Sequence, residues 1–435
     1  MIASRQRWAV LVAALAACSG PGAEDVGVDV GSDGGHDAAR DAGVDASLDV
    51  GRDTWLPDGG WLTIADNPDP ARCELYEAGP ELVAATTWPL EPCGDRAGCR
   101  RIRSPGGPVD SQPFQTERGH GVHDGTRGLF VLYTDSDPGL SGYIDAWIVD
   151  DAARALMGIR TRAVTSGDSC TQGFYDVSET EYAFVLLRLV QPAEIANFLY
   201  RNRLDLAPAQ VTDIRSPFAS GTAQEVRLDG VRAAAWMSFQ SVQGVEADGT
   251  FSVVSPHGES CAIADVVGDA IFIECSMPTN VFTQQPHGAP TPLFGSANNY
   301  GLDSDGTDMA WVRFAALDDG GITTEIWTAP HTANPASVHE REIATVPPGN
   351  LASPYDLRVG FGYAALLEQD DRVGVYRLAD GARAQIDAPV GEFFGRGFIQ
   401  YIGPEEIVLT STLQLSRNGD SQVMFIRLDS LTFVP

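Results

Sequence analysis

The feature that most constrains the fold is a loose repeat of short strand patterns, which runs from about Gln112 to the end of the 435-residue chain. The clearest copies begin at Asp124-Gly125, Asp229-Gly230 and Asp305-Gly306, and each turn dipeptide leads into an apolar run with an aromatic residue. Weaker copies of the apolar run are Tyr182–Leu186, Ala270–Ile273, Tyr363–Leu367 and Glu406–Leu409. The copies are centred on residues 130, 184, 236, 272, 311, 366 and 408, which lie 36 to 55 residues apart. Recurrence at this spacing indicates one supersecondary unit used many times.

A second short strand pattern follows most copies after a polar turn. These second patterns are Tyr143–Val149, Phe251–Val254, Thr324–Thr328, Val373–Leu378 and Val423–Leu428. Amphipathic helical runs are nearly absent, and the best candidate, Pro192–Arg203, fits a strand equally well. Short antiparallel strands at a period in the forties predict an all-β fold, a β-propeller of about seven blades over residues 111–435. Six or eight blades also fit the spacing, and the alternative folds are a β-sandwich or two stacked β domains.

The copies also resemble the WD-like repeats of TolB-type periplasmic propellers. The likeness is best at Ser304–Pro330 and at Asp124–Asp151, where Asp-Gly precedes an apolar strand that ends in a short turn. The Ser-Pro pair that usually precedes Asp-Gly in that family is missing from every copy. The resemblance therefore implies the propeller fold and transfers no functional residue.

The N-terminus has the layout of a secretory signal peptide over residues 1–17. Arg5 and Arg7 precede an apolar run from Trp8 to Ala17, which has about half the roughly 20 residues that a membrane-spanning helix needs. The ending Leu15-Ala16-Ala17-Cys18 resembles the bacterial lipobox. That resemblance implies a lipoprotein whose chain is cleaved ahead of Cys18, with acyl chains on this cysteine that anchor it to the membrane. The alternative is an ordinary signal peptide followed by a chance cysteine.

An acidic, glycine-rich segment follows over residues 18–60. Aspartates recur there with a four-residue period, at Asp25, Asp29, Asp33, Asp37, Asp41, Asp45, Asp49 and Asp53. Like charges at this spacing repel each other on a helix, and the segment has too little apolar surface to fold. We expect a disordered tether, with calcium binding by the aspartate ladder as the alternative. Ser19 after the cysteine favours an outer-membrane location in the cell envelope, either periplasmic or surface-exposed.

Composition excludes several function classes. The formal net charge of −30 would repel nucleic acid and anionic lipid headgroups, whereas cationic ligands or divalent ions suit such a surface. The sequence contains no lysine, which excludes a phosphate-loop lysine, a Schiff-base lysine and a Ser-Lys dyad.

Six cysteines remain after Cys18, and an even number in an exported protein predicts disulfides. Cys261 and Cys275 are equidistant from a turn near Gly268-Asp269, so a β-hairpin would place them opposite each other. Cys93 and Cys99 are near neighbours and are expected to close a short loop, which leaves Cys73 and Cys170. The segment 61–110 is rich in cysteine and proline, and we expect it to cap the propeller or to complete its last blade.

Two groups of residues are candidates for a ligand or metal site. His120, His257 and His287 each precede a glycine, and loops of a propeller can converge on the channel mouth, where histidines could hold a divalent metal. Asp303 and Asp305 belong to a sequence that echoes calcium loops, although the acids that such loops need on either side are missing. For both groups we expect solvated turn residues, with the ligand or metal site as the alternative.

The chain carries no assembled catalytic motif, and we therefore expect a lipid-anchored, non-enzymatic binding module for a protein or glycan partner without a cofactor. The alternative is a metal-assisted polysaccharide lyase or hydrolase at the channel mouth, which would use Ca²⁺ or another divalent metal. A third hypothesis is a mainly structural envelope protein.

Overall fold

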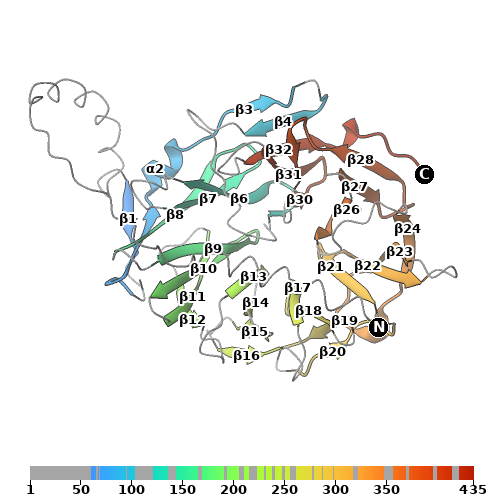
Figure 1. Ribbon diagram of the computed structural model, residues 1–435, viewed down its shortest axis with the longest axis horizontal. Helices are drawn as coiled ribbons and strands as arrows, with labels where there is room; N and C mark the ends of the chain where they lie inside the picture. The colour runs from blue at the N-terminus through green and yellow to red at the C-terminus, as the bar shows by residue number, and fades with distance from the viewer. Residues whose placement is uncertain are drawn as a thin grey trace, which may run out of the picture. The chain divides into compact units, whose positions relative to one another are not determined.

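The computed structural model divides the chain into two units, Met1–Trp55 and Leu56–Pro435, and the description below concerns the second (Figure 1). The structure describes residues 60–64, 67, 69–94, 96–102, 121–135, 144–164, 169–190, 194–204, 210–214, 223–229, 232–237, 241–246, 250–254, 261–276, 279–286, 288–296, 298–316, 322–346, 356–368, 372–394, 399–413 and 421–435.

The described strands form seven antiparallel sheets, and five of them contain four strands each in chain order. Blade 2 contains β9 (Ser169–Val177), β10 (Glu181–Val190), β11 (Glu194–Arg203) and β12 (Gln210–Ile214). Blade 3 contains β13 (Ala223–Asp229), β14 (Arg232–Met237), β15 (Ser241–Val245) and β16 (Phe251–Val253). Blade 4 contains β17 (Cys261–Val267), β18 (Ala270–Ser276), β19 (Thr279–Gln284) and β20 (Thr291–Pro292). Blade 5 contains β21 (Asn299–Ser304), β22 (Asp308–Ala316), β23 (Ile322–Pro330) and β24 (Arg341–Val346). Blade 6 contains β25 (Arg358–Gly360), β26 (Tyr363–Glu368), β27 (Arg372–Arg377) and β28 (Arg383–Asp387).

Blades 1 and 7 are larger because strands from the N-terminal segment extend their outer edges. Blade 1 contains β5 (Val122–His123), β6 (Gly128–Asp135), β7 (Ile144–Asp150) and β8 (Ala155–Ala163), followed by β2 (Cys73–Ala78) and β1 (Trp61–Thr63). Blade 7 contains β29 (Glu392–Phe393), β30 (Ile399–Ile402), β31 (Glu406–Leu413) and β32 (Ser421–Arg427), followed by β4 (Cys99–Ile102) and β3 (Leu90–Pro92). Within the described residues, the helical elements are α2 (Pro80–Ala85) and two 3₁₀ turns, η3 (Pro335–Ser337) and η5 (Leu428–Ser430).

The seven sheets close into a β-propeller, as their order in Figure 1 shows. From blade 2 to blade 6, the first strands of successive blades contact one another. The contacts of β30 with β25 and with β5 join blade 7 to blades 6 and 1, and β8 contacts β9 between blades 1 and 2. The last blade is completed by the N-terminal β4, which pairs antiparallel with the C-terminal β32 from Val423↔Ile102 to Ile426↔Cys99. A single sheet therefore contains strands from both ends of the described chain, and this pairing holds the ring closed.

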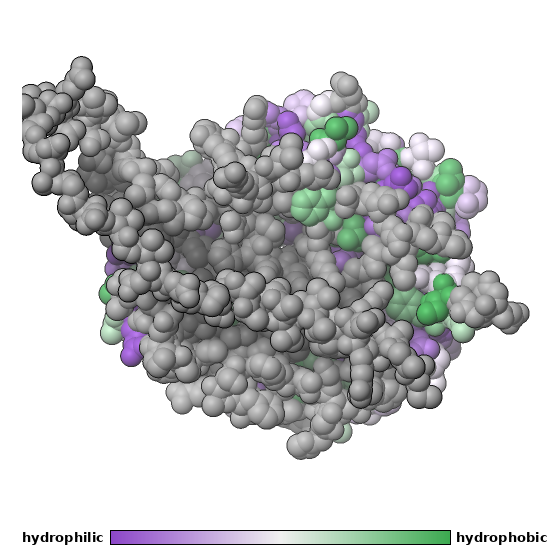
Figure 2. All heavy atoms as spheres, viewed as in Figure 1, coloured by the Kyte–Doolittle hydropathy of each residue, from purple (hydrophilic) through white to green (hydrophobic). Residues whose placement is uncertain are grey.

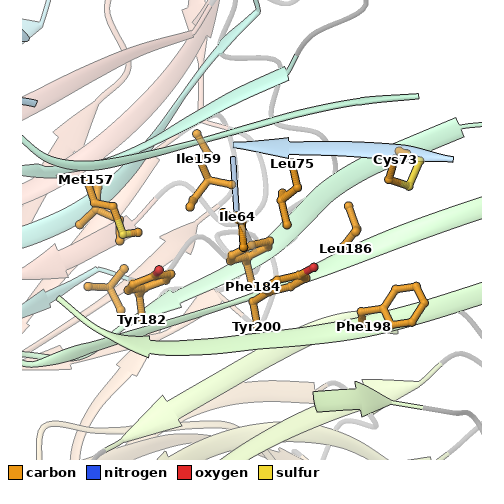
Figure 3. Close-up of a cluster of buried hydrophobic side chains, with 14 of the residues drawn as sticks. Ile64, Cys73, Leu75, Met157, Ile159, Tyr182, Phe184, Leu186, Phe198 and Tyr200 are labelled. Carbon is orange, nitrogen blue, oxygen red and sulfur yellow. A yellow bond between two sulfur atoms is a disulfide. The ribbon is translucent and has the colours of Figure 1, made fainter. Parts of the chain in front are cut away.

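The core of the ring lies between the blades. Within the described residues, seven clusters of buried side chains each combine residues from two neighbouring blades, and together they cover all seven interfaces. Figure 3 shows the cluster between blades 1 and 2, where the rings of Phe184 and Tyr200 stack with centroids 4.6 Å apart. Side chains alternate between the two faces of a strand, so apolar residues on both faces let each sheet pack against both of its neighbours.

The repeat predicted from the sequence coincides with the blades. Six of the seven repeat centres fall in the second strand of a blade, namely β6, β10, β14, β18, β22 and β26. The seventh falls in β31, which follows β29 and β30 in blade 7 and pairs with both. Pro192–Arg203, which fitted a helix or a strand, contains β11, which pairs with β10 along its whole length. The N-terminal segment completes the last blade through β3 and β4, and β1 and β2 extend the first blade in addition.

Three disulfides cross-link the propeller. Cys261 and Cys275 are paired residues of β17 and β18 and are bonded, in agreement with the hairpin predicted around Gly268-Asp269. Cys93 is bonded to Cys99 across a separation of 6 residues. Cys73 at the start of β2 is bonded to Cys170 in β9, and this bond joins the outer edge of blade 1 to the first strand of blade 2.

The described surface is mixed in character. In Figure 2, hydrophilic residues lie beside single hydrophobic ones over the part of the ring formed by the C-terminal blades. Among the described residues, no helix is long and apolar enough to cross a membrane.

Candidate functional site

Four of the residues singled out from the sequence lie outside the described residues. They are the lipidation candidate Cys18 and the three histidines His120, His257 and His287. Lipid attachment and a histidine metal site at the channel mouth therefore stay predictions. Within the part of the chain that the structure describes, no group of three or more His, Cys, Asp or Glu side chains could hold a metal ion.

Asp303 and Asp305 are described, and they connect blade 5 to blade 6. Asp303 is only 7% exposed, so its interpretation as a solvated turn residue was wrong. Its Oδ2 accepts a hydrogen bond from the backbone N–H of Val359 at 2.6 Å, and the Arg358 guanidinium lies 3.3 Å from its Oδ1. Asp305 is exposed and caps its own turn, because its Oδ1 accepts the N–H groups of Thr307 and Asp308 at 2.9 and 2.8 Å. Both carboxylates thus bind protein donors.

The contact made by Asp303 recurs around the ring. Asp176 of β9 accepts the N–H of Leu228 in β13 at 2.5 Å, and Asp265 of β17 accepts the N–H of Ser304 in β21 at 2.9 Å. In each case a carboxylate on the first strand of one blade binds the backbone of the first strand of the next blade. Hydrogen bonds to an ionised group are the stronger kind, so these aspartates fix the spacing of neighbouring blades.

The buried aspartates share their environment with two arginines. Arg227 lies 2.8 Å from Glu225 on β13, and Arg358 lies on β25. Burial raises the pKa of Asp265 well above its ordinary value, and the nearby Asp303 raises it further while Arg227 lowers it. Burial likewise raises the pKa of Asp176 and of Asp303. Perturbed carboxyl groups occur in active sites and in structural networks alike. Here the three aspartates each bind a neighbouring blade, which assigns them a structural role.

The turns between the first and second strands of the blades form one rim of the ring, which we call the inner-turn rim. Aspartate carboxylates link neighbouring turns of this rim by accepting backbone N–H groups of the next blade. Asp229 of the blade 3 turn accepts the N–H of Gly268 in the blade 4 turn at 2.6 Å. Asp305 of the blade 5 turn accepts the N–H of Phe361 in the blade 6 turn through its Oδ2 at 2.9 Å. The Asp-Gly dipeptide that revealed the repeat therefore also supplies a bridge to the next blade.

Phe361 is the most unusual residue on this rim. It forms, with Gly362, a two-residue turn between the paired residues Gly360 and Tyr363. Both turn residues have positive φ, 49° for Phe361 and 78° for Gly362. Such a turn favours Asn or Gly at its first position, because a left-handed conformation costs a bulky residue roughly 1–2 kcal/mol. The Phe361 side chain is nevertheless 39% exposed.

His123 supports Phe361 from blade 1. Its ring packs edge-to-face on Phe361 with centroids 5.2 Å apart, and it lies 5.7 Å from the ring of Tyr401 in blade 7. The N–H of Gly125 donates to His123 Nδ1 at 2.9 Å, which fixes that nitrogen as an acceptor. Burial lowers the pKa of His123, against the opposing charges of Asp151 and Asp124, so the ring is neutral at neutral pH. Three blades thus meet at an aromatic group of which Phe361 is the exposed member.

Sequence reasoning missed Phe361. A signal for it exists, because Phe361-Gly362 interrupts two apolar strand patterns where a tight turn must occur. Reading that turn as one that needs positive φ at both positions would have marked the phenylalanine as out of place.

Comparison with known proteins finds no relative by sequence and only distant similarity to solved structures. No family model and no curated protein matches the chain. Among solved structures it is similar to the β-propeller domain of the Trilobed protease from Pyrococcus furiosus, with 11% identity and a TM-score of 0.44, covering 73% of this chain and 97% of that one. It is also similar to BamB from Moraxella catarrhalis, with 12% identity and a TM-score of 0.35, covering 78% and 96% of the two chains.

Neither similarity carries a conclusion about activity or partners. A given fold hosts many unrelated functions, and function resides in the site.

Proposed function

We propose that this protein is a lipid-anchored component of the cell envelope whose propeller acts as a non-enzymatic binding module for a protein or glycan partner. The anchor is Cys18, which ends the lipobox-like Leu15-Ala16-Ala17-Cys18. The three disulfides of the ring support an oxidising compartment outside the cytoplasm. The outer membrane is the proposed location, in keeping with Ser19 after the cysteine.

The acidic segment between anchor and ring supports this arrangement. A flexible chain of about 40 residues has an r.m.s. span of roughly 35 Å, and its repeated aspartates extend it further by repulsion. The ring would then have access to partners beyond the lipid headgroups. The whole chain has a formal charge of −30, which opposes direct binding of the protein to an anionic membrane surface.

A single observation carries the binding role, namely the exposed aromatic Phe361 in a left-handed turn on a rigid ring. Residues in unfavourable backbone conformations cluster at ligand clamps and active sites, where their side chains are needed. The carboxyl groups of Asp176, Asp265 and Asp303 accept hydrogen bonds from the backbone of the next blade, so they stabilise the ring. A partner would then bind at the rims of the ring.

The anchor is tested by metabolic labelling with a fatty-acid probe and by mass spectrometry of the N-terminal peptide. Wild-type protein should carry label and fractionate with membranes, whereas a Cys18→Ser variant should lack both properties. An unmodified and uncleaved N-terminus on the wild-type protein would contradict the anchor.

The binding role is tested separately. In-cell cross-linking followed by purification of the full-length protein should recover one dominant partner, and the purified ring should leave a panel of polysaccharides intact. Turnover of a polysaccharide that is abolished by a metal chelator would instead support the lyase or hydrolase hypothesis.

A further inference from the structure

The chain uses phenylalanine in blade 6 at a turn position where blade 4 uses glycine. The turn between β17 and β18 in blade 4 joins the paired residues Val267 and Ala270 and has Gly268 at its first position, with φ of 56°. The turn of blade 6 has the same length and places Phe361 there instead. The Asp305 carboxylate binds the backbone N–H of Phe361, a contact that any non-proline residue could make. The hydrogen bonding of the turn therefore gives no reason for a phenylalanine side chain.

Packing alone does not require this side chain either. Its ring touches His123 on one side, yet 39% of the residue stays exposed, and it is the sole aromatic among the exposed large hydrophobic residues whose burial the structure describes. Ile322 and Val390 are more exposed, at 72% and 105%, but neither adopts positive φ. Phe361 combines exposure with an unfavourable backbone, and that combination is typical of a contact residue.

The charged groups around the phenyl ring of Phe361 determine which kind of ligand can bind there. The carboxylate of Asp305 is bonded to its backbone, and the charges of Asp124 and Asp151 act on the adjoining His123. Two cations near this group are each offset by a carboxylate, since Arg127 lies 3.8 Å from Asp124, and Arg100, whose charge acts on Tyr401, lies 3.0 Å from Glu406. An aromatic face flanked by negative charge attracts a guanidinium or ammonium group, and arginine is the commoner partner of such a face. The negative charge of the whole chain attracts a basic molecule over a longer range.

We propose that Phe361 is the anchor of a binding site for a basic polypeptide segment, and that this site places an arginine or lysine side chain of the partner over the phenyl ring. His123 holds the ring in position, and Asp305 holds the turn. The inference rests on the proposed binding function and names the class of partner for it, which is a basic protein segment and not a glycan.

The test uses the full-length protein and two defined probes, hexa-arginine amide and its uncharged isostere hexa-citrulline amide. Calorimetric titration should show that Phe361→Asn weakens hexa-arginine binding by about 5- to 30-fold, the range of a cation–aromatic contact. Phe361→Leu should weaken it nearly as much, because leucine keeps the apolar bulk and lacks the aromatic face. Ile322→Asn removes an exposed apolar side chain elsewhere and should leave the affinity unchanged.

Folding is controlled within the same set of variants. Asparagine suits the left-handed conformation, so Phe361→Asn should unfold at an equal or higher urea concentration than the wild type, and lost binding cannot then be ascribed to lost structure. Equal binding of hexa-arginine by the wild type and Phe361→Asn would overturn the proposal, as would equal binding of the citrulline probe. A cross-linked partner recovered by both proteins would leave the binding function intact while removing Phe361 from it. Tighter binding of an oligosaccharide than of hexa-arginine at this residue would identify a glycan site instead.

Discussion

The three disulfides should contribute to stability in the order of the loops that they close. The loops span separations of 97, 14 and 6 residues for Cys73–Cys170, Cys261–Cys275 and Cys93–Cys99. In the chain-entropy model, a cross-link removes conformational freedom from the unfolded chain and so raises the free energy of unfolding. The corresponding contributions are about 4.7, 3.0 and 2.4 kcal/mol at 25 °C.

Each disulfide can be removed by replacing both cysteines with alanine, and the free energy of unfolding measured by urea titration. Cys73, Cys261 and Cys275 are nearly fully buried, so alanine also changes their packing. The packing effect is removed by repeating each comparison under reducing conditions, where wild type and variant differ only in their side chains. The difference between the oxidised and reduced comparisons is then the contribution of the cross-link.

The order of the three contributions is the critical result. A larger loss for Cys93–Cys99 than for Cys73–Cys170 would refute the reasoning, because it would mean that folded-state geometry outweighs unfolded-chain entropy in this ring. Equal losses for all three would refute it in the same way.

Three further predictions concern the contacts between blades. Arg232 is fully buried and donates hydrogen bonds to Glu246 and Gln284 at 2.9 and 3.0 Å. Arg232→Met should therefore lower the free energy of unfolding, measured by urea titration, by about 3–5 kcal/mol. An unchanged urea midpoint would contradict a stabilising role for these hydrogen bonds. Because burial raises the pKa of Asp265 above its ordinary 3.8, the folded state binds more protons than the unfolded state, and stability should rise as pH falls through the raised pKa toward 3.8. Asp265→Asn should flatten that rise, and an equally steep rise in this variant would exclude Asp265 as its source. A Cβ at Gly128 would overlap the ring of Tyr401. Gly128→Ala should therefore lower the free energy of unfolding, measured by thermal unfolding, by about 1–3 kcal/mol. Adding Tyr401→Ala to this variant should recover part of the lost stability if the two residues compete for that space.

The second strands of the blades could be predicted from the sequence because they are buried on both sides. In β22, for example, Met309 through Val312 are all buried, and such a continuous apolar run stands out against its polar turns. First strands are harder to recognise, since β5 has only two residues and β25 only three. Several first strands also carry buried charges such as Asp176 and Arg358, which look like surface residues in a sequence.

Other features depend on contacts between distant residues and leave no local pattern. The pairing of β4 with β32 places Ile102 opposite Val423, and neither segment contains a sequence signal that identifies the strand with which it pairs. The burial of Asp303 has the same origin, because Arg358 and Val359 of the next blade surround it. Phe361 was missed for a different reason, namely that its significance lies in a backbone angle and not in the residue type.

The bond between Cys73 and Cys170 also determines how the ring would respond to tension applied at its N-terminal end. A pull there would first peel β1 from β2 one residue pair at a time, starting at Trp61↔Ala78, which needs little force. The peeling would stop at Cys73, the first residue of β2, because the disulfide passes the load to β9 in the middle of the fold. Because β9 is paired with β10 from Ser169 to Val177, the load would then be shared by the sheet of blade 2, and the ring could bear tension at this end without opening.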